Sequence, residues 1–136
     1  MAMKDINIVV EDTPVYIRQW AASTAISNLS KGLEIFGDDL VPFLRGEADF
    51  VQILRLLRAA GSNGPEVIQE FVSSARVDGA EIRNTQDYNK IYTGRLTFLF
   101  EVFTKVCEVN YKDFFEQGLN SQEQPPQAPQ KESAQA

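Results

Sequence analysis

The sequence predicts an α+β protein that is predominantly α-helical, with an N-terminal β-hairpin packed on a bundle of about four helices and a disordered C-terminal tail. β-Branched residues gather before residue 20, whereas from about residue 26 apolar residues recur every three or four positions. After Gly118 the composition changes abruptly to Gln, Pro, Ser and Ala. We therefore expect a single folded domain over residues 1–118 and a disordered tail over residues 119–136.

The composition excludes several classes of function. A chain of 136 residues with 43% hydrophobic residues can bury one core. Its net charge of −6 repels phosphate backbones, which argues against a nucleic-acid partner. The sequence has no histidine, the most frequent side chain in proton transfer near neutral pH. Cys107 is the single cysteine and cannot form an intrachain disulfide, which favours a reducing compartment such as the cytoplasm.

Neither a signal peptide nor a membrane span is expected. The apolar run near the start covers only Ile8–Val10, and the apolar segment Leu96–Val109 is interrupted by charged and hydroxyl side chains.

The N-terminal hairpin is predicted from two short strands. The segment "INIVV" is rich in β-branched residues, "EDTP" is typical of a turn in which Pro14 fixes φ, and "VYIRQW" alternates between apolar and polar residues. Because two strands alone are marginally stable in water, the hairpin must pack on other elements.

The first helix is predicted to end at Gly37 and to bury one stripe, formed by Ile26, Leu29, Leu33 and Phe36. A short helical segment should follow, in which Asp38 or Asp39 caps the start and Pro42 prevents a long regular helix.

A helical hairpin is predicted next. Its first helix ends at Gly61 and should bury Phe50, Ile53, Leu54 and Leu57. Its second helix starts at Pro65 and Glu66 and should bury Val67, Ile68, Phe71 and Val72.

The most apolar helix begins at about Gly94 and is expected to be central. The "VDG" sequence at Val77–Gly79 predicts a turn before it, while residues 80–94 are too polar and irregular for an assignment. The central helix has a wide apolar face that consists of Leu96, Leu99, Phe103, Val106 and Asn110, flanked by Phe100, Cys107, Tyr111 and Phe114.

No pattern predicts a catalytic, cofactor-binding or metal site. The spacing from Gly32 to Gly37 matches the start of a P-loop, but Asp38 stands where the phosphate-binding lysine is needed. An acidic group has no calcium-loop spacing and is better interpreted as a solvated helix start; it consists of Asp38, Asp39, Glu47 and Asp49.

Two groups of residues leave alternatives open. Arg55 and Arg58 are either solvated charges or contacts to an acidic partner. In "CEVNYKDFF", Asn110 either bonds nearby backbone or caps a final turn, with Phe114 and Phe115 anchoring the chain end. Alternatively, the paired aromatic residues belong to a protein-binding surface.

The chain resembles the tail assembly chaperones of long-tailed bacteriophages over about residues 5–116. The resemblance lies in the β-rich start, the "VDG" turn, the "DYNKIYTGRL" segment with its Tyr92–Arg95 step, and the closing helix "LFEVFTKVCEVNYKDFF".

The resemblance implies a non-enzymatic factor in the host cell cytoplasm that binds the tape measure protein, helps to recruit the tail tube protein and is absent from the mature virion. It also implies self-association and a longer form made by programmed frameshift, of which this chain resembles the shorter product. The candidate partner contacts are Arg55, Arg58, Tyr92, Asn110, Tyr111, Phe114 and Phe115. The alternative is a tail-completion or connector protein that is retained in the virion. An enzyme with carboxylate or lysine chemistry is a third reading.

Overall fold

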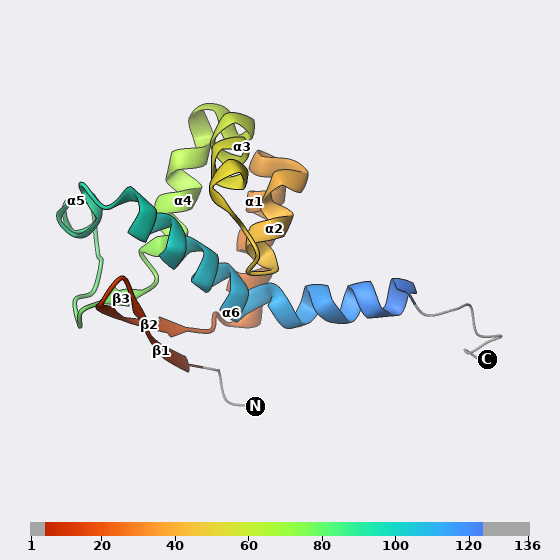
Figure 1. Ribbon diagram of the computed structural model, residues 1–136, viewed down its shortest axis with the longest axis horizontal. Coiled ribbons are helices and arrows are strands. Elements are labelled where there is room, and N and C mark those ends of the chain that lie inside the picture. The colour runs from red at the N-terminus through yellow and green to blue at the C-terminus, as the bar shows by residue number, and fades with distance from the viewer. Residues whose placement is uncertain (1–4, 124–136) are drawn as a thin grey trace.

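A small antiparallel sheet and several helices pack around one long C-terminal helix in the computed structural model, which describes residues 5–123, with side chains to residue 117 (Figure 1). The order of elements confirms the predicted α+β, predominantly helical fold. The sheet lies at one end of the molecule, and the last turns of the long helix extend past the other elements (Figure 1).

Strands β1 (Asp5–Val10) and β2 (Thr13–Arg18) form the predicted hairpin. Glu11 and Asp12 make its two-residue turn with φ of 49° and 64°, the left-handed geometry that matches the twist of the two strands. Pro14 was expected in the turn but lies in β2 opposite Val9. Because the two left-handed residues already reverse the chain, no third turn residue is needed.

The hairpin extends to a three-stranded sheet, which the sequence did not predict. Strand β3 (Arg76–Val77) pairs with β2 in the order β1-β2-β3. The expected turn at Val77–Gly79 is confirmed, with φ of 52° at Asp78 and 80° at Gly79. A strand of two residues is too short to show an alternating pattern.

Helix α1 (Ala22–Phe36) ends at Gly37 as predicted, with a φ of 62° at that glycine. Its buried face is different from the predicted one, because Asn28 and Gly32 are buried with Phe36. Ile26 and Leu33 are exposed instead. A Cβ atom on residue 32 would lie 2.8 Å from Leu40 Cδ2, so close packing of the next segment selects the glycine face.

The expected break after α1 is confirmed by a 3₁₀ helix, η1 (Gly37–Leu40), and a single turn, α2 (Val41–Leu44), with Pro42 at its start. The expected cap is wrong, because no side chain forms a capping hydrogen bond there. The N-cap position of η1 is held by Phe36, whose side chain has no hydrogen-bond acceptor, and Asp38 and Asp39 lie inside η1 instead.

Helices α3 (Phe50–Ala60) and α4 (Gly64–Val72) are joined by η2 (Gly61–Asn63). Helix α4 begins with Pro65 in its first turn and buries all four predicted residues. Helix α3 buries Leu56 and Ala60, whereas Phe50, Leu54 and Leu57 are exposed. The prediction for α3 was therefore wrong at three of four positions, since the core covers only the Leu56 side of this helix.

Helix α5 (Thr85–Tyr92) occupies the segment that the sequence left unassigned. Its start is capped by Asn84, whose Oδ1 accepts the Asp87 N–H at 2.9 Å. Its few apolar residues give no clear periodicity, but Tyr92 at its end is buried.

The central helix is α6 (Leu96–Glu123), as predicted. It packs on the sheet and on α2, α4 and α5, and its fully buried residues are Phe98, Val102, Phe103, Val106 and Cys107. The helix continues past Gly118, where the folded domain was expected to end. A single glycine costs a helix only about 1 kcal/mol, and no proline occurs between the start of α6 and Pro125. Residues 124–136 of the predicted tail lie outside the described part.

Candidate functional site

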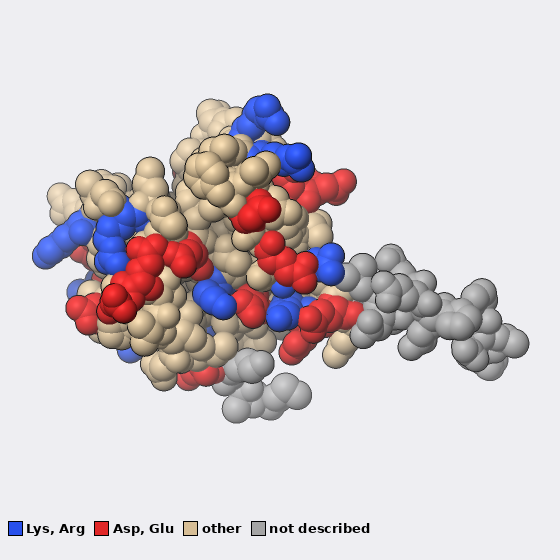
Figure 2. Space-filling model, in the orientation of Figure 1, with Lys and Arg blue, Asp and Glu red and all other residues tan. Residues whose placement is uncertain are grey.

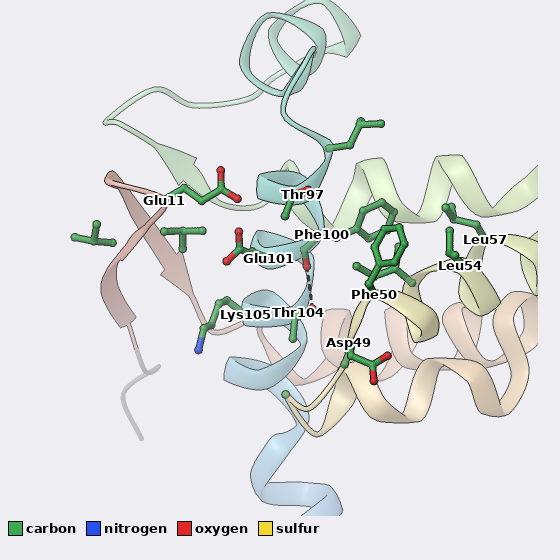
Figure 3. Close-up of a pocket in the computed structure, with 16 residues that line it drawn as sticks. Glu11, Asp49, Phe50, Leu54, Leu57, Thr97, Phe100, Glu101, Thr104 and Lys105 are labelled. Atoms are coloured by element: carbon green, nitrogen blue, oxygen red, sulfur yellow. Dashed lines mark hydrogen bonds between the residues drawn. The ribbon is translucent and has the colours of Figure 1, made fainter.

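A groove with exposed apolar walls lies between the hairpin turn, α3 and the first turns of α6 (Figure 3). Its volume is about 520 Å³. Five large side chains that line it are between 42% and 71% exposed: Val9, Phe50, Leu54, Leu57 and Leu96. A contiguous group of exposed apolar residues of this kind is typical of a protein-binding surface.

One wall of the groove is a stripe on α3. Phe50, Leu54 and Leu57 are spaced by four and three residues and so share one side of the helix. A capping box fixes the start of α3, because the Asp49 carboxylate accepts the Gln52 N–H at 2.9 Å and the Gln52 side chain accepts the Asp49 N–H at 2.7 Å. The wall is therefore held in place although its outer side chains are exposed.

The second wall is a stripe on α6. Leu96, Phe100 and Thr104 are each four residues apart and line the groove together. Phe100 is almost completely buried and points into the space between α6 and α3, where Phe50 lies opposite (Figure 3). The Thr104 hydroxyl donates to the Phe100 carbonyl oxygen at 2.8 Å, which satisfies its polar group within α6.

The hairpin side of the groove is acidic. The carboxyl groups of Glu11, from the hairpin turn, and Glu101, from α6, point toward each other (Figure 3). A hydrogen bond with Glu11 raises the pKa of Glu101, with smaller contributions from burial and from the charge of Glu11, while Lys105 acts in the opposite direction. The Lys105 ammonium lies 3.2 Å from a Glu108 carboxylate oxygen.

The predicted partner contacts do not form one surface. Arg55 and Arg58 are exposed on α3, outside the residues that line the groove, and form no ion pair within residues 5–117. Tyr92 is buried, and its hydroxyl donates to the Val72 carbonyl oxygen at 3.2 Å. Burial raises the pKa of the Tyr92 hydroxyl above its ordinary value.

Asn110 connects α6 to the start of the helical part. Its Oδ1 accepts the Trp20 N–H at 2.7 Å, and its Nδ2 donates to the Val106 carbonyl oxygen at 2.9 Å. The expected local hydrogen bond is thus confirmed, whereas the expected helix stop is wrong, because α6 continues to Glu123. The neighbouring Tyr111 hydroxyl donates to the Ala25 carbonyl oxygen at 2.6 Å.

Of the paired phenylalanines, only Phe115 packs against the core as expected of an anchor. Phe114 is largely exposed and Phe115 is partly buried, with ring centroids 5.2 Å apart. Phe114 lines a smaller apolar groove of about 200 Å³ together with Ile26 and Leu29 of α1. It is therefore a surface residue, and the expectation that it belongs to the core is wrong.

Sequence reasoning missed the large groove because a helical apolar stripe was interpreted as core. The width of the apolar surface on α3 was the available signal. Six apolar side chains occur between residues 50 and 57, on more of the helix circumference than one core face requires: Phe50, Val51, Ile53, Leu54, Leu56 and Leu57.

Among residues 5–117, no group of three or more His, Cys, Asp or Glu side chains is placed to hold a metal ion. Burial raises the pKa of the Cys107 thiol, so the buried thiol is an unreactive core group. No helix in the same range combines the length and apolar character needed to cross a lipid bilayer.

Comparison with known proteins gives one finding. Residues 11–122 match a family model described as phage tail assembly chaperone protein, TAC. The comparisons with curated proteins and with solved structures give no match. The match covers both walls of the groove and the acidic side chains at its hairpin side.

Proposed function

Because the chain belongs to the phage tail assembly chaperone family, we propose that it binds the tape measure protein during tail morphogenesis and helps to recruit the tail tube protein. The apolar groove between α3 and α6 is the observation that carries this proposal. The activity is one of holding a client, and it requires no chemical step.

The groove suits a client of the tape measure type. Such a protein is long, helical and apolar, so it needs an apolar surface to cover it before assembly. Val9, Phe50, Leu54, Leu57 and Leu96 are available on this chain without unfolding any element. When a client covers these side chains, the binding free energy gains about 25 cal/mol for every Å² of apolar surface removed from water.

The charged exterior fits the same role. Figure 2 shows acidic side chains over the hairpin turn and the start of α6, and basic side chains over the end of α3. The net charge of −6 favours a soluble complex after the apolar surfaces have been covered. A chaperone of this kind keeps its client in solution until the tail tube protein arrives.

The proposal also covers where the protein acts in the infected cell, how it associates and when it leaves the assembling tail. It acts in the host cytoplasm, associates with itself along a long client, has a longer frameshifted form and leaves before the virion is complete. Mass spectrometry of purified virions tests the last point, because a tail-completion or connector protein would be present in stoichiometric copies. Analytical ultracentrifugation tests self-association, and a monomer at high concentration would contradict it.

The central test is co-expression of the full chain with tagged tape measure protein, and separately with tail tube protein. We expect the tape measure protein to copurify, and a Phe50→Ala substitution to reduce the yield about tenfold or more, as at an interface hot spot. Val51→Ala is the control on the same helix, because Val51 is 54% exposed and Phe50 69%, but only Phe50 lines the groove between α3 and α6. If neither client copurifies with the unsubstituted chain, the proposed function is wrong.

A further inference from the structure

We propose that the groove binds one amphipathic helix of the partner, oriented so that Lys or Arg residues at one edge of its apolar stripe face Glu11 and Glu101. This inference rests on the proposed function, since it names the chemistry of the client segment that the same groove takes. It follows from the shape of the two walls and from the charge at one side.

The walls fit a helix better than an extended strand. Four of the five exposed apolar residues come from helices, Phe50, Leu54 and Leu57 from α3 and Leu96 from α6, and only Val9 comes from a strand. Both helical walls carry side chains at intervals of three or four residues, and such ridges pack against the grooves of another helix. The stripe from Phe50 to Leu57 spans about 10 Å, equal to about two turns of a client helix.

The negative charge at the hairpin side of the groove favours basic residues on the edge of the client helix that faces it. Two carboxyl groups face each other there, and neither Glu11 nor Glu101 forms an ion pair within residues 5–117 (Figure 3). When both carboxyl groups are ionised they repel each other, and a partner cation beside them would relieve the repulsion. A basic client edge is therefore favoured at this side of the groove.

Each nearby cation of the chain has its close contact with a residue other than Glu11 or Glu101. Lys105 is paired with Glu108. Arg95 donates to the Thr13 hydroxyl at 2.9 Å, and its guanidinium lies 3.9 Å from the centre of the Phe98 ring. Three carboxylates line the groove, those of Glu11, Asp49 and Glu101, against the single ammonium of Lys105.

The α3 wall of the groove does not share the acidic character of the hairpin side. Asp49 uses its carboxylate to cap α3. Arg55 and Arg58 project from α3 outside the groove lining. The attraction for a basic edge is consequently confined to the hairpin side, and a client helix has one preferred edge there.

The test uses two synthetic peptides of about 18 residues, long enough for about five helical turns, with the same leucine stripe. One peptide carries lysine and the other glutamate beside the stripe, and binding to the full chain is measured by fluorescence anisotropy. We expect the lysine peptide to bind about tenfold tighter at low ionic strength, and the preference to shrink in about 0.5 M salt, where charges are screened. Circular dichroism should show a gain of helix on binding.

Matched substitutions identify the groups responsible. In the double variant Glu11→Gln and Glu101→Gln, the preference for the lysine peptide should fall below about threefold, because the facing charges are removed. The variant Asp38→Asn and Asp39→Asn removes the same charge from residues outside the groove lining and should keep the full preference. Thermal unfolding of both variants shows whether each one is folded.

The outcomes separate this inference from the proposed function. Equal affinity for both peptides, no binding of either, or binding without a gain of helix would each overturn the inference; the last would point to a strand added at the β1 edge. Phe50-dependent copurification of the tape measure protein would still support the function in those cases. Conversely, a charge preference without copurification would support the groove chemistry and contradict the function.

Discussion

Asn110 shows how a single polar residue in an apolar helix can join distant parts of the chain. Its side-chain amide accepts from the Trp20 backbone and donates to the Val106 carbonyl, so both ends of the amide are used. Trp20 in turn makes edge-on ring contacts with Phe71 and Tyr111, at centroid distances of 5.1 and 6.0 Å. The residue therefore fixes where the chain leaves the sheet and enters α1.

Replacing Asn110 with alanine should lower the free energy of unfolding by about 1 to 3 kcal/mol, because the partly buried Trp20 N–H loses its acceptor. Urea denaturation measures the change. Asp113→Ala is the control on the same helix, since Asp113 is exposed, and it should change stability by less than about 0.5 kcal/mol. Similar losses in both variants would contradict the structural role of Asn110.

The carboxyl pair of Glu11 and Glu101 gives a pH-dependent prediction. The pKa of Glu101 is higher in the folded protein than in the unfolded chain, chiefly because of the hydrogen bond with Glu11. The folded state then binds more protons, so the contribution of Glu101 to stability increases as the pH falls through the folded-state pKa and stays constant below the unfolded-state pKa.

Glu11→Gln should bring the pKa of Glu101 down toward its ordinary value, because an amide donates to the ionised carboxylate instead of repelling it. Carbon-13 NMR titration of the Glu101 side chain measures this shift. Asp113→Asn, which changes an exposed acid elsewhere on α6, should leave the pKa of Glu101 where it was. An unchanged Glu101 titration in the Glu11→Gln variant would show that the two groups do not interact.

At the scale of elements, the helices differ in how well their sequences predicted their buried faces. Helix α4 buries its whole predicted stripe, because it lies between the other helices and α6. Helix α3 has an equally clear stripe, but three of its residues line the open groove. In α1 the glycine and asparagine face is buried, since Gly32 allows Leu40 to approach.

Phenylalanines on α6 provide a direct test of which face of the helix is core. Phe103 is fully buried among Phe43, Phe71 and Phe100, so Phe103→Ala should cost about 3 to 5 kcal/mol of unfolding free energy. Phe114→Ala should cost less than about 1 kcal/mol, because the ring is largely exposed. Chemical denaturation of both variants measures the difference, and equal costs would show that Phe114 is part of the core.

At the scale of the whole molecule, one connected core contains buried residues from the sheet and from α1, α2, α3, α4 and α6. Cys107 lies inside that core and is fully buried. The rate at which its thiol reacts with a reagent therefore measures how often the core unfolds.

Cys107 should react with a thiol-specific disulfide reagent far more slowly in the native protein than in urea, by about 100-fold or more, because labelling requires the core to open. Burial also raises the pKa of the thiol, which keeps the reactive thiolate scarce. Absorbance at the wavelength of the released thiol follows the reaction, and complete labelling in urea is the control. Rapid labelling without denaturant would mean that α6 is not held in a closed core.

The sequence by itself determined the fold class, the hairpin, most helix ends and the central place of α6, because local turns and helical periodicity depend on residues close together in the chain. It did not reveal β3 or α5, whose patterns are too short or too polar to recognise. Only the tertiary structure decided that the α3 stripe is open and that Asn110 meets Trp20, 90 residues away. The physical reason is that periodicity defines the apolar side of a helix, whereas the packing of distant elements decides how much of that side is covered.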